Sequence, residues 1–87
     1  MLGPDHPDTA GSLYWLAYIY SNQGKYEQAE PLYQRTLKIY KETLPPDHPN
    51  IAGMLGNYAR LLRKMNRIEE ATTLEKQARE IRARRST

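Results

Sequence analysis

The segment 2–8 reads Leu-Gly-Pro-Asp-His-Pro-Asp, and the segment 44–50 reads Leu-Pro-Pro-Asp-His-Pro-Asn. When the chain is compared with itself at a shift of 42 residues, thirteen positions are identical. Self-similarity at a fixed period of this length is typical of stacked supersecondary units, each of which cannot bury its apolar face alone. The repeat therefore predicts two similar units, residues 1–43 and 44–87.

Length and composition limit what the chain can be. With 87 residues and no cysteine, the sequence predicts a small core without disulfide bonds or thiolate zinc ligands, and self-association is a plausible source of added stability. No apolar run approaches the roughly 18 residues of a membrane-spanning helix, and Met1 leads into a proline-rich turn instead of a basic and apolar leader. We therefore expect a soluble cytoplasmic protein with no membrane contact.

Charge is distributed unevenly along the chain, whose formal net charge is +3. Residues 1–43 contain four basic and five acidic side chains, whereas residues 44–87 contain nine basic and five acidic ones. The second unit is therefore the basic one.

Apolar residues recur at intervals of three and four in the first unit, which predicts two amphipathic helices. The first stripe, which predicts a helix near 8–22, consists of Ala10, Leu13, Leu16, Ala17 and Tyr20. The second, which predicts a helix near 25–42, consists of Tyr26, Ala29, Leu32, Tyr33, Thr36, Leu37 and Tyr40. Gly24 between them can adopt the left-handed conformation that favours a helix end. Pro31 removes one backbone hydrogen bond, so we expect a bend there.

The second unit follows the same plan, with helices predicted near 49–64 and 67–84. Its stripes consist of Ile51, Leu55, Tyr58, Ala59 and Leu62, and of Ala71, Leu74, Ala78 and Ile81. Asn66 replaces Gly24 at the turn, because asparagine also tolerates a positive φ. Asp5 and Asp47 are predicted to cap the first helix of each unit. Gly53 and Gly56 indicate either a close backbone approach or simple tolerance.

These residues resemble the tetratricopeptide repeat. The resemblance rests on Leu13, Leu16-Ala17, Tyr20, Gly24, Tyr26, Ala29 and Tyr33, and on Leu55, Tyr58-Ala59, Leu62, Ala71 and Ala78. The longer period and the run Gly-Lys-Tyr-Glu-Gln-Ala-Glu-Pro-Leu-Tyr-Gln-Arg at 24–35 are similar to the kinesin-light-chain variety of the repeat. The second unit departs from the pattern at Glu75, where the family usually has an aromatic residue, and at Asn66 and Ile68.

The resemblance implies an all-α fold of two helix-turn-helix units, four antiparallel helices in a short right-handed α-solenoid. It also implies that the first helix of each unit lines a concave groove for extended peptides or partner proteins. The side chains expected to contact a partner are Tyr14, Trp15, Tyr18, Asn22, Asn57, Arg60, Arg63 and Lys64. The family often has two asparagines where this chain has Tyr14-Trp15 and Gly56-Asn57, so only Asn57 keeps the amide that bonds a ligand's backbone.

An aromatic surface beside a basic one favours an extended partner segment with an apolar or aromatic side chain and acidic residues. Two alternatives remain open. Trp15 and Tyr14 can pack against a neighbouring unit or another copy of the chain, including a domain-swapped copy exchanged at Leu44-Pro45-Pro46. Arg60, Arg63, Lys64 and Arg67 can form an ordinary solvated helix face.

The polar character of the last helix suggests an outward face that no further unit covers. The polar residues that indicate such a face are Thr72, Thr73, Glu75, Gln77 and Arg79. A carboxylate at position 75 would be costly under a following unit, but not in water. The first unit has no equivalent polar face, which suggests either a fragment of a longer array or a surface covered by association.

Other chemistries fit the sequence less well. Asp5-His6 and Asp47-His48 precede helices and are explained as caps, so we expect no metal and no cofactor. No nucleophile with a base at a motif spacing and no phosphate-binding glycine loop is present, so we expect no enzyme. The arginines at 79, 82, 84 and 85 are interspersed with glutamates, which disfavours nucleic acid as the partner.

Overall fold

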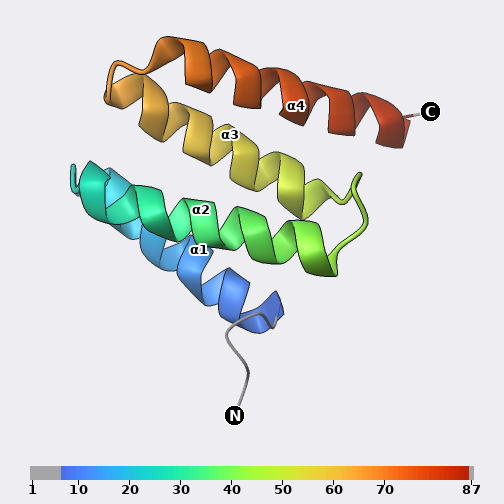
Figure 1. The fold of residues 1–87 in the computed structure, drawn as a ribbon, viewed down its shortest axis with the longest axis horizontal. Helices are drawn as coiled ribbons and strands as arrows, with labels where there is room; N and C mark the ends of the chain where they lie inside the picture. Colours follow the sequence, from blue (N-terminus) through green and yellow to red (C-terminus); the bar gives the residue numbers. More distant parts are fainter. Residues whose placement is uncertain (1–6, 87) are drawn as a thin grey trace. The chain divides into compact units, whose positions relative to one another are not determined.

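The computed structural model describes residues 7–86, and every regular element within them is an α-helix. The four helices are α1 (Pro7–Asn22), α2 (Tyr26–Thr43), α3 (Pro49–Lys64) and α4 (Ile68–Ser86) (Figure 1). The all-α fold predicted from the repeat is confirmed.

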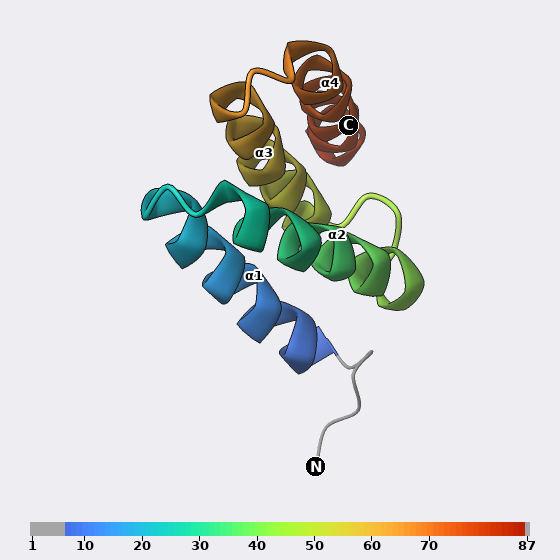
Figure 2. The ribbon, with the colours of Figure 1, turned by 60° about the vertical axis from the view of Figure 1, so that its left-hand side comes forward.

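The chain divides into two compact units, unit 1 ending at Leu44 and unit 2 beginning at Pro45. In unit 1, α1 packs against α2, and in unit 2, α3 packs against α4. Each unit is a hairpin in which the second helix runs back along the first (Figures 1 and 2). The helices thus pack in pairs, as the sequence period predicts.

The turns within the two hairpins have the same backbone structure. In unit 1, Gly24 has a φ of 79°, and the Lys25 N–H donates to the Tyr20 carbonyl at 2.9 Å. In unit 2, Asn66 has a φ of 64°, and the Arg67 N–H donates to the Leu62 carbonyl at 2.8 Å. This is the Schellman pattern, which uses the last free carbonyls of a helix. The replacement of glycine by asparagine therefore preserves the turn, as predicted.

The cap of α3 differs from the prediction. His48, not Asp47, is the N-cap residue, and its Nδ1 accepts a hydrogen bond from the Asn50 N–H at 3.0 Å. Pro49 occupies the first helical turn, where a missing N–H costs nothing. Asp47 therefore lies one residue too early. The predicted cap at Asp5 lies outside the described residues.

Small residues allow the helices of each hairpin to approach closely. Ala10 and Ala17 of α1 and Ala29 of α2 are fully buried. Their counterparts 42 residues later, Ala52, Ala59 and Ala71, are buried as well. Apolar burial of this kind is the main driving force for helix packing. The alanines that repeat in the sequence are thus core residues.

Three side chains in unit 1 depart from the expected pattern. Leu16 was placed in the apolar stripe but is exposed, because it lies about 100° around α1 from the buried Ala17. Ser21 does not belong to the predicted stripe of this helix but is buried. Ile39 was left out of the stripe of α2, yet it is fully buried. Single-helix periodicity thus identified the centre of the buried face better than its borders.

Pro31 lies within α2, which continues through it as one α-helix from Tyr26 to Thr43. The proline side chain is exposed, so its ring does not disturb the core. The bend expected at this position stays a prediction.

Candidate partner-binding surfaces

The exposed side of α1 carries aromatic and apolar side chains. Trp15 is 64% exposed and Tyr18 is 36% exposed, and their rings stack with centroids 6.1 Å apart at an interplanar angle of 25°. Leu16 beside them is also exposed. Between Thr9 and Asn22 the sequence contains no Lys, Arg, Asp or Glu. This surface can contact an apolar or aromatic group without removing a charge from water.

Tyr14 is directed toward α2 instead. Its ring lies 6.1 Å from the ring of Tyr33, tilted by 58°. Burial raises the pKa of Tyr40, and electrostatic interaction with Tyr14 raises it further. Tyr14 therefore contributes to the packing of α1 on α2, whereas Trp15 and Tyr18 face solvent.

The remaining predicted residue of unit 1 is Asn22, the last residue of α1. Its side chain is exposed. About two turns of helix, or about 10 Å along the axis, separate Asn22 from Trp15. Asn22 therefore lies at the C-terminal end of α1. A partner that contacts both Trp15 and Asn22 must extend along the helix.

The exposed side of α3 is basic. Arg60 and Lys64 lie one helical turn apart and are both exposed, and Asn57 is half-buried on the preceding turn. Arg60, Lys64 and Asn57 are the unit 2 counterparts of Tyr18, Asn22 and Trp15, respectively. The exposed face of α3 is thus basic where that of α1 is aromatic.

Arg63 already has an anionic partner within unit 2. Its Nε and Nη2 donate to the two carboxylate oxygens of Glu75 at 2.7 Å each. The hydrogen bond from Arg63 lowers the pKa of Glu75; burial opposes this shift, and the charges of Arg63 and Arg79 add to it. A planar guanidinium that is bound through two nitrogens is held in one orientation. Arg63 therefore acts first as a link between α3 and α4.

Sequence reasoning missed the contribution of α4 to this surface. Arg82 extends to α3, where its Nη2 lies 4.0 Å from the position that a Cβ on Gly56 would occupy. In an antiparallel helix pair, a step toward the N-terminus on one helix faces an equal step toward the C-terminus on the other. Position 56 is seven residues before 63, and position 82 is seven residues after 75, so both pairs fit one register. Applying that register to the two predicted stripes could have found the contact.

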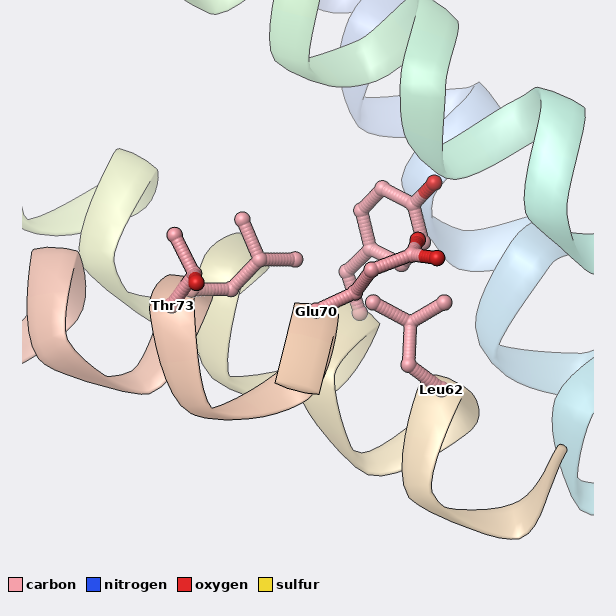
Figure 3. Close-up of a pocket in the computed structure, with 5 residues that line it drawn as sticks. Leu62, Glu70 and Thr73 are labelled. Atoms are coloured by element: carbon pink, nitrogen blue, oxygen red, sulfur yellow. The ribbon is translucent and has the colours of Figure 1, made fainter. Parts of the chain in front are cut away.

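A second feature of unit 2 is an open cavity of about 250 Å³ on another side of the hairpin. It is lined by Tyr58, Leu62, Glu70, Thr73 and Leu74 (Figure 3). The one carboxylate in the lining, Glu70, is held by Arg67, with Nη2 2.6 Å from Oε2. The cavity thus offers apolar walls and an acid that is already paired, and none of the predicted contact residues lines it.

Comparison with protein-family models gives a match to the tetratricopeptide repeat over residues 8–84. The chain belongs to the tetratricopeptide repeat family. The match covers nearly the whole chain and agrees with the pairwise packing of the four helices. Membership implies protein partners in general. The comparison with curated proteins found no match for this tetratricopeptide repeat chain.

The structure describes residues 7–86 of the tetratricopeptide repeat chain. Among these residues, no helix is long and apolar enough to span a membrane. The same residues contain no group of three or more His, Cys, Asp or Glu side chains with the geometry of a metal site.

Proposed function

We propose that this chain is a non-catalytic interaction module of the kinesin-light-chain type of tetratricopeptide repeat. Its partner presents an apolar or aromatic side chain to α1 and acidic residues to α3. The observation that carries the proposal is the exposure of Trp15, stacked on Tyr18, in a part of α1 that has no charged side chain from Thr9 to Asn22. Tryptophan and tyrosine contribute large contact areas with little loss of side-chain entropy, and they are enriched where binding energy is concentrated.

The basic residues of α3 supply the second half of the interaction. Arg60 and Lys64 can attract an acidic segment over a distance and then form charge-assisted hydrogen bonds with its carboxylates. An exposed lysine or arginine in water contributes little by itself. The proposal therefore assigns affinity mainly to the aromatic surface of α1, and specificity and association rate mainly to α3.

Trp15 is the only tryptophan of the chain, which makes its fluorescence a direct test. We expect peptides that contain both an aromatic residue and acidic residues to shift the Trp15 emission to shorter wavelength as the indole leaves water. Arg60→Glu should weaken this binding, whereas Lys38→Glu on α2 should not. Because Trp15→Ala removes this signal, binding to that variant is measured by the fluorescence anisotropy of a fluorescein-labelled peptide. Binding that is unchanged by both Trp15→Ala and Arg60→Glu, with unchanged circular dichroism, would refute the proposal.

A second candidate function is self-assembly, and the exposed cluster of Trp15, Leu16 and Tyr18 favours it. Uncharged apolar surfaces of this kind also mark contacts between copies of a protein. Analytical ultracentrifugation separates the two candidates. Self-assembly predicts a sedimentation coefficient that rises with protein concentration and falls back to the monomer value for Trp15→Ala. A monomer at all concentrations eliminates it.

A further inference from the structure

Four arginines and one glutamate lie along one side of unit 2, where α3 and α4 meet. The residues of this α3–α4 edge are Gly56, Arg60, Arg63, Glu75, Arg79 and Arg82. Two contacts define its length. At one end Arg63 holds Glu75 at 2.7 Å, and at the other end the guanidinium of Arg82 lies 4.0 Å from the Cβ position of Gly56.

These two contacts fix where the remaining arginines lie. From one contact to the other, α3 runs back by seven residues and α4 runs forward by seven, which is about 10 Å along each helix. Arg60 lies between the contacts on α3, and Arg79 lies between them on α4. Arg79 is close enough for its charge to act on Glu75. The backbone positions of Arg60, Arg79 and Arg82 thus lie within about 10 Å of one another along the helix axes.

The edge has more positive than negative charge. Both oxygens of Glu75 are occupied by Arg63, so this carboxylate serves mainly one of the four arginines. Arg60 and Arg79 are exposed, so their charged ends are accessible to a ligand. Gly56 adds space, because the backbone of α3 carries no side chain at the point where Arg82 approaches it. A group of arginines beside a bare stretch of helix suits a ligand with paired anionic oxygens.

We propose that the α3–α4 edge is where an acidic protein segment binds, with Arg60, Arg79 and Arg82 contacting neighbouring carboxylates of that segment. This inference rests on the proposed function and deepens it, because it adds two residues of α4 to the contact surface of α3. Arg63 stays bound to Glu75 and fixes α3 against α4 at one end of this edge. The partner feature that this site selects is a pair of adjacent aspartate or glutamate residues.

An acidic protein segment fits this edge better than a nucleic acid does. Sequence-tolerant binding of single strands relies on exposed aromatic rings on which bases stack. Tyr58 is the only Phe, Tyr or Trp between residues 44 and 87, and it is 7% exposed. A length of about 10 Å also matches only a few phosphates of a strand. Several adjacent carboxylates need no aromatic partner and fit within that length.

The test compares two charge-matched variants of α4. Arg79→Gln with Arg82→Gln removes two charges from the edge, whereas Arg84→Gln with Arg85→Gln removes two charges from the last turn of the same helix, beyond the end of the edge. The probe is a short fluorescein-labelled peptide of alternating Asp and Glu, measured by fluorescence anisotropy at low salt. We expect the first variant to weaken binding by about tenfold or more and the second by less than about threefold.

Each outcome has a defined meaning. Equal weakening by both variants shows that only overall charge matters, and it overturns the inference. Tighter binding of an oligothymidylate of equal charge than of the peptide overturns it in favour of nucleic acid. If Arg60→Glu abolishes peptide binding and Arg79→Gln with Arg82→Gln does not, the inference fails while the proposed function stands. If the unaltered chain does not bind the acidic peptide, the α3 half of the proposed function fails as well.

Discussion

The two hairpins share one backbone plan but use opposite chemistry along the same edge. A shift of 42 residues carries the α3–α4 edge onto an α1–α2 edge made of Tyr14, Tyr18, Ser21, Tyr33, Leu37 and Tyr40. In unit 1 the helices meet there through tyrosine rings, with Tyr14 against Tyr33. In unit 2 the pair formed by Arg63 and Glu75 joins the helices. The comparison shows that the repeat specifies the alanine core and the turns, while the edge residues can change completely.

The largest difference between the edges should appear when Tyr33 and its counterpart Glu75 are each replaced by alanine. Tyr33 is 1% exposed, so Tyr33→Ala leaves a cavity and should lower the free energy of unfolding by about 3–5 kcal/mol. Glu75 takes part in an exposed ion pair, and such pairs contribute little. We therefore expect a much smaller loss for Glu75→Ala, measured by urea denaturation.

Tyr33→Phe serves as the control for the first comparison. It keeps the ring and removes only the hydroxyl, so most of the stability should remain. If Tyr33→Ala and Glu75→Ala cost the same, the proposed contrast between a packed edge and a solvated one is wrong.

The turns provide the next largest effect. Gly24 has a φ of 79°, in the left-handed region that costs other residues about 1–2 kcal/mol. Gly24→Ala should therefore lower the stability by about that amount. Gly24→Asn should lose less, because Asn66 adopts the same conformation in unit 2. Equal losses for alanine and asparagine, measured by thermal and urea denaturation, would contradict the equivalence of the two turns.

Replacing glycines within the helices by alanine should raise the stability instead of lowering it. A Cβ on Gly56 would meet only Arg82 Nη2, at 4.0 Å, and a Cβ on Gly11 would meet nothing within 4 Å. Both positions are helical, so Gly56→Ala and Gly11→Ala should each raise the free energy of unfolding by about 0.5–1 kcal/mol. Gly24→Ala is the matched control with a positive φ. A loss of stability for Gly56→Ala would mean that the α3–α4 edge needs a closer approach.

The sequence predicted those parts of the fold that depend on local chemistry. Alternation at three and four residues located the helices, and glycine or asparagine at 24 and 66 located the turns. The sequence did not predict which residues at the borders of a buried helix face are buried. The pattern of one helix does not determine how far around it the second helix makes contact. For this reason the exposed Leu16 was included in the predicted stripe and the buried Ser21 was left out.

The surface residues were predicted less completely, for a related reason. Trp15 and Arg60 were identified because their helix faces are unusual in composition. Arg63 and Glu75 are 12 residues apart, and their contact depends on the register between two helices. That register is a tertiary property, so the sequence showed a polar residue at 75 without showing what binds it. Arg79 and Arg82 were treated as part of a basic tail for the same reason.

The smallest predicted difference between the edges is their response to pH, which should have opposite directions. In the folded chain, Arg63 lowers the pKa of Glu75 below its usual value, so this group stabilises the fold at neutral pH and the contribution is lost as the pH falls through the lowered pKa. Burial raises the pKa of Tyr40 above its usual value. Its contribution is complete below about pH 10 and is lost as the pH rises toward the raised value.

Glu75→Gln and Tyr40→Phe separate these two contributions. Urea denaturation from about pH 3 to about pH 11 should show that Glu75→Gln flattens only the acid side of the stability profile. Tyr40→Phe should flatten only the alkaline side, because phenylalanine has no proton to lose. If Tyr40→Phe leaves the alkaline loss unchanged, another tyrosine is responsible, and the α1–α2 edge does not differ from the α3–α4 edge in this respect. The two variants together thus test whether one backbone plan holds an edge by burial in unit 1 and by charge in unit 2.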